Sequence, residues 1–396
     1  MKVLFLLSLA ALLVYSNTFS VPFHYDDQLN IVDNPQVHSL ADFTDFLGSR
    51  SVGFLSFALN YAAGGLNVFG YHLVNLLIHV ANGFLVYWLV VLLFQSVIPA
   101  KAGIQSLRPG MDSRFRGNDV FGRSGYVALT TALLFIVHPI QTQAVTYVVQ
   151  RLASLMTLFY LLAVVCYLKW RLFGETTDQG PGTRDQKLQV TGLFKRSLVT
   201  GHRSLVTGHW SRVWYVASLL STLLAMKTKE NSFTLPFMIL LVEWVFFRPV
   251  RKKQWMALIP FLLTLLIVPF SMGAAPGEEQ FAQQTMSLSR TDYLFTQFRV
   301  IVTYLRLLVL PINQNVDYGY PAYHSLFEPT VFASFLLLLS LFTPAVYLLF
   351  RPKSGTAPVQ GNVQSSTLNF ELLTLNFPLR LVSFGILWFF ITLSIE

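Results

Sequence analysis

The sequence predicts an all-α polytopic membrane protein, and two observations support this class. Hydrophobic residues make up 54% of the 396 residues and charged residues only 12%, which is too little polar surface for a water-soluble chain of this length. Apolar runs close to the length of a bilayer crossing also recur along the chain. They lie near 3–20, 71–94, 124–139, 143–170, 212–226, 232–247, 254–272, 330–350 and 379–395. We therefore expect a bundle of about nine transmembrane helices.

The first run could be a signal peptide, because Lys2 precedes an apolar stretch from Val3 to Val14. No small-residue cleavage pattern precedes Val21-Pro22. We expect an uncleaved first span.

Loop charges orient the spans. Basic residues gather in four segments, 95–123, 171–211, 248–253 and 351–353, and Lys and Arg favour cytoplasmic loops. Acidic residues dominate two intervening loops, with Asp26, Asp27, Asp33, Asp42 and Asp45 in one and Glu278 and Glu279 in the other. We expect the N-terminus to be cytoplasmic and the acidic loops to lie outside. The formal charge of +9 reflects this topology, so we expect no nucleic-acid partner.

Two cytoplasmic loops, about 95–123 and 171–211, have the character of insertions. The first is rich in Gly, Arg and Pro without periodicity, and the second contains a direct duplication of Arg-Ser-Leu-Val-Thr-Gly-His at 196–209. Copies this short do not make a repeat fold. We expect irregular loops without a role in chemistry.

Two further segments predict amphipathic helices at the outer face. One covers about 54–65 and the other 291–310, which a count of inside and outside loops predicts not to cross. Arg299 and Arg306 are seven residues apart and share a helical face. They either snorkel to the interface or, in an external or re-entrant helix, bind a lipid phosphate.

The acidic pair Asp26-Asp27 follows the first apolar run, after Phe23-His24-Tyr25. Ionisable groups at a membrane edge are functional candidates, and a carboxylate there can accept a proton from a hydroxyl. The alternative is a solvated loop with a turn at Asp33-Asn34-Pro35. A divalent metal held by the pair has no support from other ligands.

Two more clusters reach the predicted outer face. His138 opens a tight turn that runs to Gln143, and Arg151 follows inside the next span. A buried arginine needs a partner, which is either a substrate phosphate or an internal group that fixes packing. Lys229 and Glu230 lie in a short hairpin, where a lysine outside opposes the positive-inside trend. That hairpin either binds an anion or is a neutral Lys-Glu pair.

These clusters, taken in order, resemble the membrane half of the tetratricopeptide-repeat O-mannosyltransferase-like family, which has a GT-C-type glycosyltransferase fold. The matching stretches are Tyr25-Asp26-Asp27 with Asn34, Leu59-Asn60-Tyr61, Tyr71-His72-Leu73-Val74-Asn75, His138 to Val145 with Arg151, Lys229-Glu230-Asn231 and Tyr304-Leu305-Arg306-Leu307-Leu308. The resemblance covers nearly the whole chain apart from the two insertions. It departs from the family at Gln143, where members that transfer sugar tend to have Glu.

The resemblance implies a bacterial inner-membrane enzyme that moves a mannose-like sugar from a polyprenyl-phosphate donor to a protein or glycan hydroxyl, with inversion. It implies Asp26 and Asp27 as catalytic residues, and no cofactor. The implied phosphate or substrate ligands are His138, Arg151, Lys229, Glu230 and Arg306. The family continues into tetratricopeptide repeats, so the chain resembles a truncated member. Two alternatives stay open: a non-catalytic or decayed anchor for a repeat scaffold, and a transporter or flippase.

Overall fold

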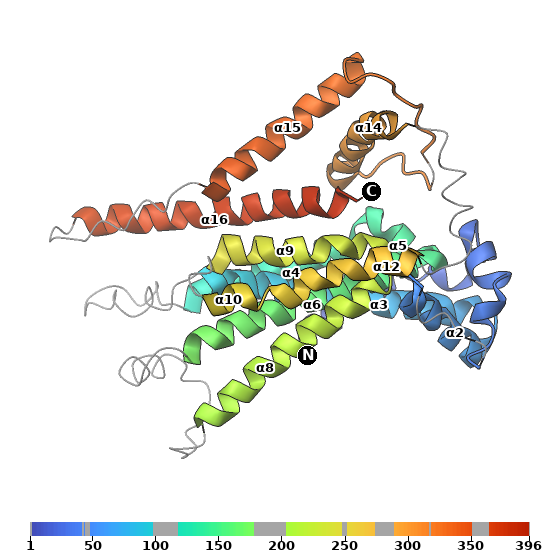
Figure 1. The fold of residues 1–396 in the computed structure, drawn as a ribbon, viewed down its shortest axis with the longest axis horizontal. Coiled ribbons are helices and arrows are strands. Elements are labelled where there is room, and N and C mark those ends of the chain that lie inside the picture. The colour runs from blue at the N-terminus through green and yellow to red at the C-terminus, as the bar shows by residue number, and fades with distance from the viewer. Residues whose placement is uncertain are drawn as a thin grey trace. The chain divides into compact units, whose positions relative to one another are not determined.

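A computed structural model describes residues 2–41, 43, 48–97, 118–177, 203–247, 252–273, 289–316, 318–350 and 364–395. Within these ranges every regular element is a helix and none is a strand (Figure 1). The predicted all-α class is confirmed. It follows from the apolar composition, because a helix satisfies its backbone hydrogen bonds within one segment and therefore suits a membrane.

Five helices in these ranges are long and apolar enough to cross a membrane. They cover Val68–Ser96, Val148–Leu172, Glu230–Phe247, Gln254–Ser271 and Pro329–Phe350. Ser124–Val137 and Pro139–Thr146 form a sixth if this pair, bent by 52°, is a single span. The count of about nine is not confirmed, because three more apolar helices have only 10–17 residues: Lys2–Tyr15, Ser211–Met226 and Leu379–Leu393.

Contacts divide the chain into two units. Unit 1 contains residues 1–235 and 255–274, and unit 2 contains residues 236–254 and 275–396. The α-helices of unit 1 are α1 (Lys2–Tyr15), α2 (Ser51–Gly64), α3 (Val68–Val97), α4 (Asn118–Val137), α5 (Thr142–Thr146), α6 (Arg151–Thr177), α8 (Arg203–Met226), α11 (Ile259–Leu263) and α12 (Ile267–Gly273). Short 3-10 or π turns cover Thr18–Ser20, Gln28–Val32, Pro35–Val37, Pro139–Gln141, Val148–Gln150, Glu230–Thr234 and Thr264–Leu266.

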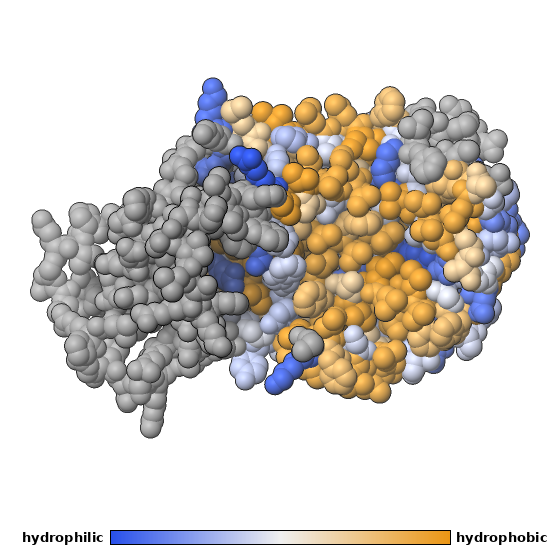
Figure 2. Space-filling view, turned by 90° about the horizontal axis from the view of Figure 1, so that it is seen from below, coloured by the Kyte–Doolittle hydropathy of each residue, from blue (hydrophilic) through white to orange (hydrophobic). Residues whose placement is uncertain are grey.

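Helix α3 lies at the centre of unit 1 and packs against α1, α4 and α6, while α6 packs against α8 (Figure 1). Leu7, Ala11 and Tyr15 of α1 join Leu76 and Val80 of α3 in one buried apolar cluster. Figure 2 shows a broad hydrophobic area on the face in view, with hydrophilic residues at several places along its borders. An exposed apolar area of this extent suits contact with lipid acyl chains.

Polar residues on α3 bind backbone carbonyls that the breaks between α4, α5 and α6 leave open. His79 Nε2 lies 3.0 Å from Ile136 O, and Asn75 Nδ2 donates to Val145 O and Val148 O at 3.4 and 3.3 Å. An unsatisfied backbone carbonyl costs several kcal/mol in the hydrocarbon core of a membrane. The polar residues on α3 therefore stabilise the two breaks between α4, α5 and α6, and so they position the start of α6.

Unit 2 contains most of α9 (Leu235–Val242), a π turn at Glu243–Phe247, part of α10 (Lys252–Met256), α14 (Arg290–Val309), α15 (Pro329–Phe350) and α16 (Gln364–Leu393). Helix α15 packs against both α14 and α16. The predicted helices near 54–65 and 291–310 are thus present as α2 and α14, with earlier starts. Their placement at the outer face stays a prediction.

The helices extend further into the two predicted insertions than the composition indicates. Helix α3 runs to Val97 and α4 begins at Asn118, so residues 98–117 lie outside the described part of the chain. Helix α8 begins at Arg203, so the second copy of the duplicated heptapeptide is helical. That copy leads directly into an apolar run, which explains how a helix can extend back into it.

Candidate functional site

The acidic pair lies in a tight turn of unit 1, and its two side chains have different surroundings. Tyr25, just before the pair, has a φ of 46°, in the left-handed region that a residue with a bulky side chain rarely adopts. The backbone N–H of Asp27 closes the turn onto His24 O at 2.9 Å. Asp27 is fully buried, whereas Asp26 is exposed.

Asp27 fastens this turn to the start of α6. Its Oδ1 accepts the backbone N–H of Val149 at 2.7 Å, and its Oδ2 accepts that of His24 at 3.0 Å. Burial raises the pKa of Asp27 above its ordinary value, although the hydrogen bonds from the backbone oppose the shift. Because both oxygens accept backbone donors, the geometry favours a structural role for Asp27.

Asp26 contacts a residue that the sequence analysis missed. Its backbone N–H donates to the hydroxyl of Tyr147 at 3.0 Å, and its carbonyl accepts from Asn30 Nδ2 at 2.8 Å. Burial raises the pKa of Tyr147 to about 12, and the charges of Asp26 and Asp27 act in the same direction. Tyr147 therefore stays protonated at neutral pH. The sequence pointed to Tyr147 only through its position, which is after the turn that begins at His138 and before Arg151.

Arg151, the first residue of α6, is fully buried. Its Nε donates to Asn75 Oδ1 at 2.7 Å, one terminal nitrogen donates to Tyr71 O at 2.9 Å, and the other donates to Ser56 O at 3.3 Å. The guanidinium carbon also lies 4.7 Å from the ring centroid of Phe57. These contacts join α2, α3 and α6. They support the alternative that Arg151 binds internal groups and fixes the packing of the helices. A contact of Arg151 with a substrate phosphate stays a prediction.

The hairpin after α8 meets the start of α2. Glu230 accepts Arg50 Nε at 2.9 Å and Ser49 Oγ at 3.0 Å, and the backbone N–H of Val52 donates to Lys227 O at 2.9 Å. A methyl group at Gly53 would lie 2.1 Å from Leu152 Cδ2, so a larger residue there would require the Leu152 side chain to move. Arg50 is a second residue that the sequence analysis missed.

Two lysines share this hairpin with Glu230. Lys227 donates to Ser271 Oγ at 2.7 Å, and Lys229 is partly buried. Glu230 forms an ion pair with Arg50 at the start of α2. The two alternatives for this hairpin, an anion site and a neutral Lys-Glu pair, both stay predictions.

The other predicted ligands have local contacts. His138 Nδ1 accepts the backbone N–H of Ile140 at 3.2 Å and so begins the turn at Pro139. In unit 2, a terminal nitrogen of Arg306 donates to Ile312 O at 2.9 Å, and one of Arg299 donates to Ser334 Oγ at 3.2 Å. His138 and Arg306 are only partly buried, so a role as substrate ligands stays a prediction for both.

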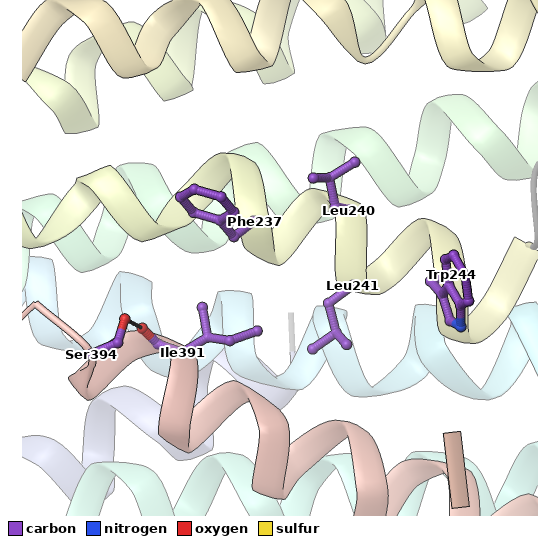
Figure 3. Close-up of a pocket in the computed structure, with 6 residues that line it drawn as sticks. All are labelled: Phe237, Leu240, Leu241, Trp244, Ile391 and Ser394. Carbon is purple, nitrogen blue, oxygen red and sulfur yellow. Dashed lines mark hydrogen bonds between the residues drawn. The ribbon is translucent and has the colours of Figure 1, made fainter. Parts of the chain in front are cut away.

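An open apolar groove of about 480 Å³ lies in unit 2, between α9 and the end of α16 (Figure 3). It is lined by Phe237, Leu240, Leu241, Trp244, Ile391 and Ser394. Figure 3 shows Leu241 and Ile391 side by side across it. None of these six described lining residues is charged.

No three His, Cys, Asp or Glu side chains gather as metal ligands within the described ranges. The two oxygens of Asp27 already accept backbone hydrogen bonds, so they fit a shared metal with Asp26 poorly.

The fold defines the chain as an all-α polytopic membrane protein. Unit 1 gathers an acidic turn and a basic hairpin around the first turns of α6, where Asp27 contacts Val149 and Gly53 contacts Leu152.

The chain is similar to curated protein O-mannosyl-transferases. It is 33% identical to TMTC2 of Mus musculus over 180 residues, which are 41% of this chain and 18% of that protein. It is 32% identical to Tmtc1 of Drosophila melanogaster over 184 residues, covering 42% and 18%. The match to TMTC4 of Homo sapiens is 29% over 187 residues, covering 43% and 23%.

The match thus spans about a fifth of the length of these curated relatives. No family model and no solved structure matches the chain. The predicted resemblance to O-mannosyltransferase-like proteins is confirmed at the level of these relatives. The bacterial source, the GT-C-type fold and the truncation before repeats stay predictions.

Proposed function

We propose that this protein is a glycosyltransferase that moves a mannose-like sugar from a polyprenyl-phosphate donor to a hydroxyl of a protein or glycan. The observation that carries the proposal is the exposed carboxylate of Asp26, held on a turn that a buried Asp27 fastens to α6. The named activity of the curated relatives supports the same class of reaction. The proposed place of reaction is the outer face of a bacterial inner membrane, with the N-terminus inside.

In this proposal Asp26 is the general base. It accepts the proton of the acceptor hydroxyl while the hydroxyl oxygen bonds to the anomeric carbon of the sugar. The bond between that carbon and the phosphate oxygen breaks, and its electron pair leaves with the phosphate. A single displacement from the opposite side inverts the anomeric carbon.

The leaving phosphate needs positive charge and hydrogen-bond donors. Arg50, Lys227 and Lys229 supply them near the start of α6, and Glu230 orients Arg50 through their ion pair. Arg306 of unit 2 and His138 remain further candidate ligands. Arg151 contributes by fixing the helices that hold these groups.

The test is sugar transfer by the purified 396-residue chain in liposomes, with a labelled polyprenyl-phosphate mannose donor and a mixture of peptide and glycan acceptors. We expect transfer by the native chain and a fall of about 10²–10⁴-fold in turnover with Asp26→Asn. Asp33→Asn is the matched control, because Asp33 lies exposed on the same loop and its carboxylate accepts a hydrogen bond from Gln28 Nε2 at 2.9 Å.

Equal turnover of Asp26→Asn and Asp33→Asn would contradict the assignment of the base. Donor that crosses the bilayer without transfer would favour a transporter or flippase. Absence of both transfer and transport would favour a non-catalytic anchor.

A further inference from the structure

The turn that carries the acidic pair includes a strained residue. Tyr25 has a φ of 46° although it is not glycine, and such a conformation is costly and persists only where the surroundings impose it. The strain places Asp26 at the surface while Asp27 points into the protein. The surroundings that impose this turn lie more than 100 residues later in the chain.

Those surroundings are the break between α5 and α6. Helix α5 ends at Thr146, and Tyr147 has an extended backbone (φ −86°, ψ 110°) before the turn Val148–Gln150. This break holds both acids, because Val149 N–H binds the carboxylate of Asp27 and the Tyr147 hydroxyl accepts the backbone N–H of Asp26. The ring of Tyr147 also packs edge-on against Tyr25, with centroids 6.4 Å apart.

The two attachments differ in kind. Asp27 is held through its own side chain, so that side chain is occupied and buried. Asp26 is exposed, and its backbone N–H donates to the Tyr147 hydroxyl. The same hydroxyl also lies within hydrogen-bonding reach of the Asp26 carboxylate. One side chain of the break therefore contacts both the backbone and the carboxylate of Asp26, which can fix the position that a general base requires.

We propose that Tyr147 is a positioning residue, whose hydroxyl holds the backbone of Asp26 so that the carboxylate faces the acceptor hydroxyl. This inference rests on the proposed transferase function. It assigns a role to a side chain far from Asp26 in sequence. It also explains the strained backbone at Tyr25, because the contacts of Tyr147 hold the turn in that conformation. A displacement of about 1 Å at a reacting group can lower a rate by about a hundredfold.

The test is Tyr147→Phe in the full chain, because phenylalanine keeps the ring contact with Tyr25 and removes the hydroxyl. We expect kcat to fall about ten- to a hundredfold while KM for the donor is unchanged, since Tyr147 is proposed to act on the base and not on the phosphate. Tyr15→Phe is the matched control. Tyr15 is buried, whereas Tyr147 is half-buried, and the Tyr15 hydroxyl donates to Ile136 O at 3.2 Å in α4. We expect its kcat to be unchanged.

A second measurement does not depend on activity. Amide hydrogen exchange of residues 22–32 should become faster in Tyr147→Phe than in Tyr15→Phe, because the bond to Asp26 is lost. Unchanged exchange in that segment would overturn the proposal, and so would faster exchange with an unchanged kcat.

A native chain without transfer activity would refute the proposed function instead. In that case the exchange measurement would still decide whether Tyr147 holds the turn.

Discussion

Arg151 Nε donates a 2.7 Å hydrogen bond to Asn75 Oδ1, and this bond joins the first turn of α6 to α3. The two terminal nitrogens of Arg151 also donate hydrogen bonds to Ser56 O and Tyr71 O. The planar guanidinium can reach three acceptors at once, whereas a lysine ammonium on a flexible chain cannot reach the same three with good geometry.

We therefore predict that Arg151→Lys lowers the stability of the protein by about 1–3 kcal/mol, the cost of leaving a buried polar partner unbound. The thermal unfolding midpoint in detergent should fall, and donor affinity of the remaining folded protein should be unchanged. Arg212→Lys is the control, because Arg212 is exposed on α8. A variant with a native midpoint and at least tenfold weaker donor binding would instead make Arg151 the phosphate ligand.

Asp27 gives a prediction for pH. Burial raises its folded pKa above the ordinary value of 3.8, so the folded state holds this proton more tightly than the unfolded state. Its contribution to stability is complete below the unfolded pKa and is lost as the pH rises through the folded pKa. Hydrogen exchange of residues 22–33, corrected for its intrinsic pH dependence, should become faster from pH 4 upward.

Asp27→Asn should remove this change with pH, since asparagine does not titrate. Protection that instead increases with pH in the native chain would show that the hydrogen bonds from His24 and Val149 outweigh the desolvation of the carboxylate.

Arg50 gives a prediction for donor binding. Its side chain is 40% exposed while it pairs with Glu230, so it can also reach an anion. We predict that Arg50→Met weakens binding of the polyprenyl-phosphate donor about tenfold, the effect of one lost hydrogen bond to a charged group. Titration of the donor in nanodiscs measures this, with Arg212→Met as the control. Equal affinities of both variants would remove Arg50 from the phosphate site.

Loop charges give a prediction for topology. Reporter fusions at residues 110, 190 and 250 should be active in the cytoplasm, and fusions at residues 40 and 285 should be active outside. Of these positions only residue 40 lies in the described part of the chain. An externally active reporter at residue 190 would reverse the predicted orientation.

The segment 98–117 gives a prediction for folding. Replacing it with a Gly-Ser linker of about ten residues should leave the thermal midpoint nearly unchanged, because loop length changes the closure free energy slowly. Helices α3 and α4, which flank it, pack against each other. Loss of folded protein would show that the segment contributes contacts of its own.

The sequence alone was sufficient for the helical class and for the order of the polar clusters. An apolar run must satisfy its backbone within itself, so composition and run length indicate a helix without tertiary information. His72, Asn75 and His79 lie three or four positions apart, so a helix over this apolar run places them on one face. The number of crossings was less readable, since α1 and the last part of α16 are shorter than a full span.

Only the tertiary structure distinguished the two adjacent aspartates. Asp26 and Asp27 have the same side chain, and their environments differ because a break 121 to 122 residues later binds one through its backbone and the other through its carboxylate. Arg50 and Glu230 are 180 residues apart, and no local pattern connects them. Hydrogen bonds act over about 3 Å in space, so the partners of these groups depend on how α2, α6 and the hairpin after α8 pack, which periodicity and charge along the chain do not specify.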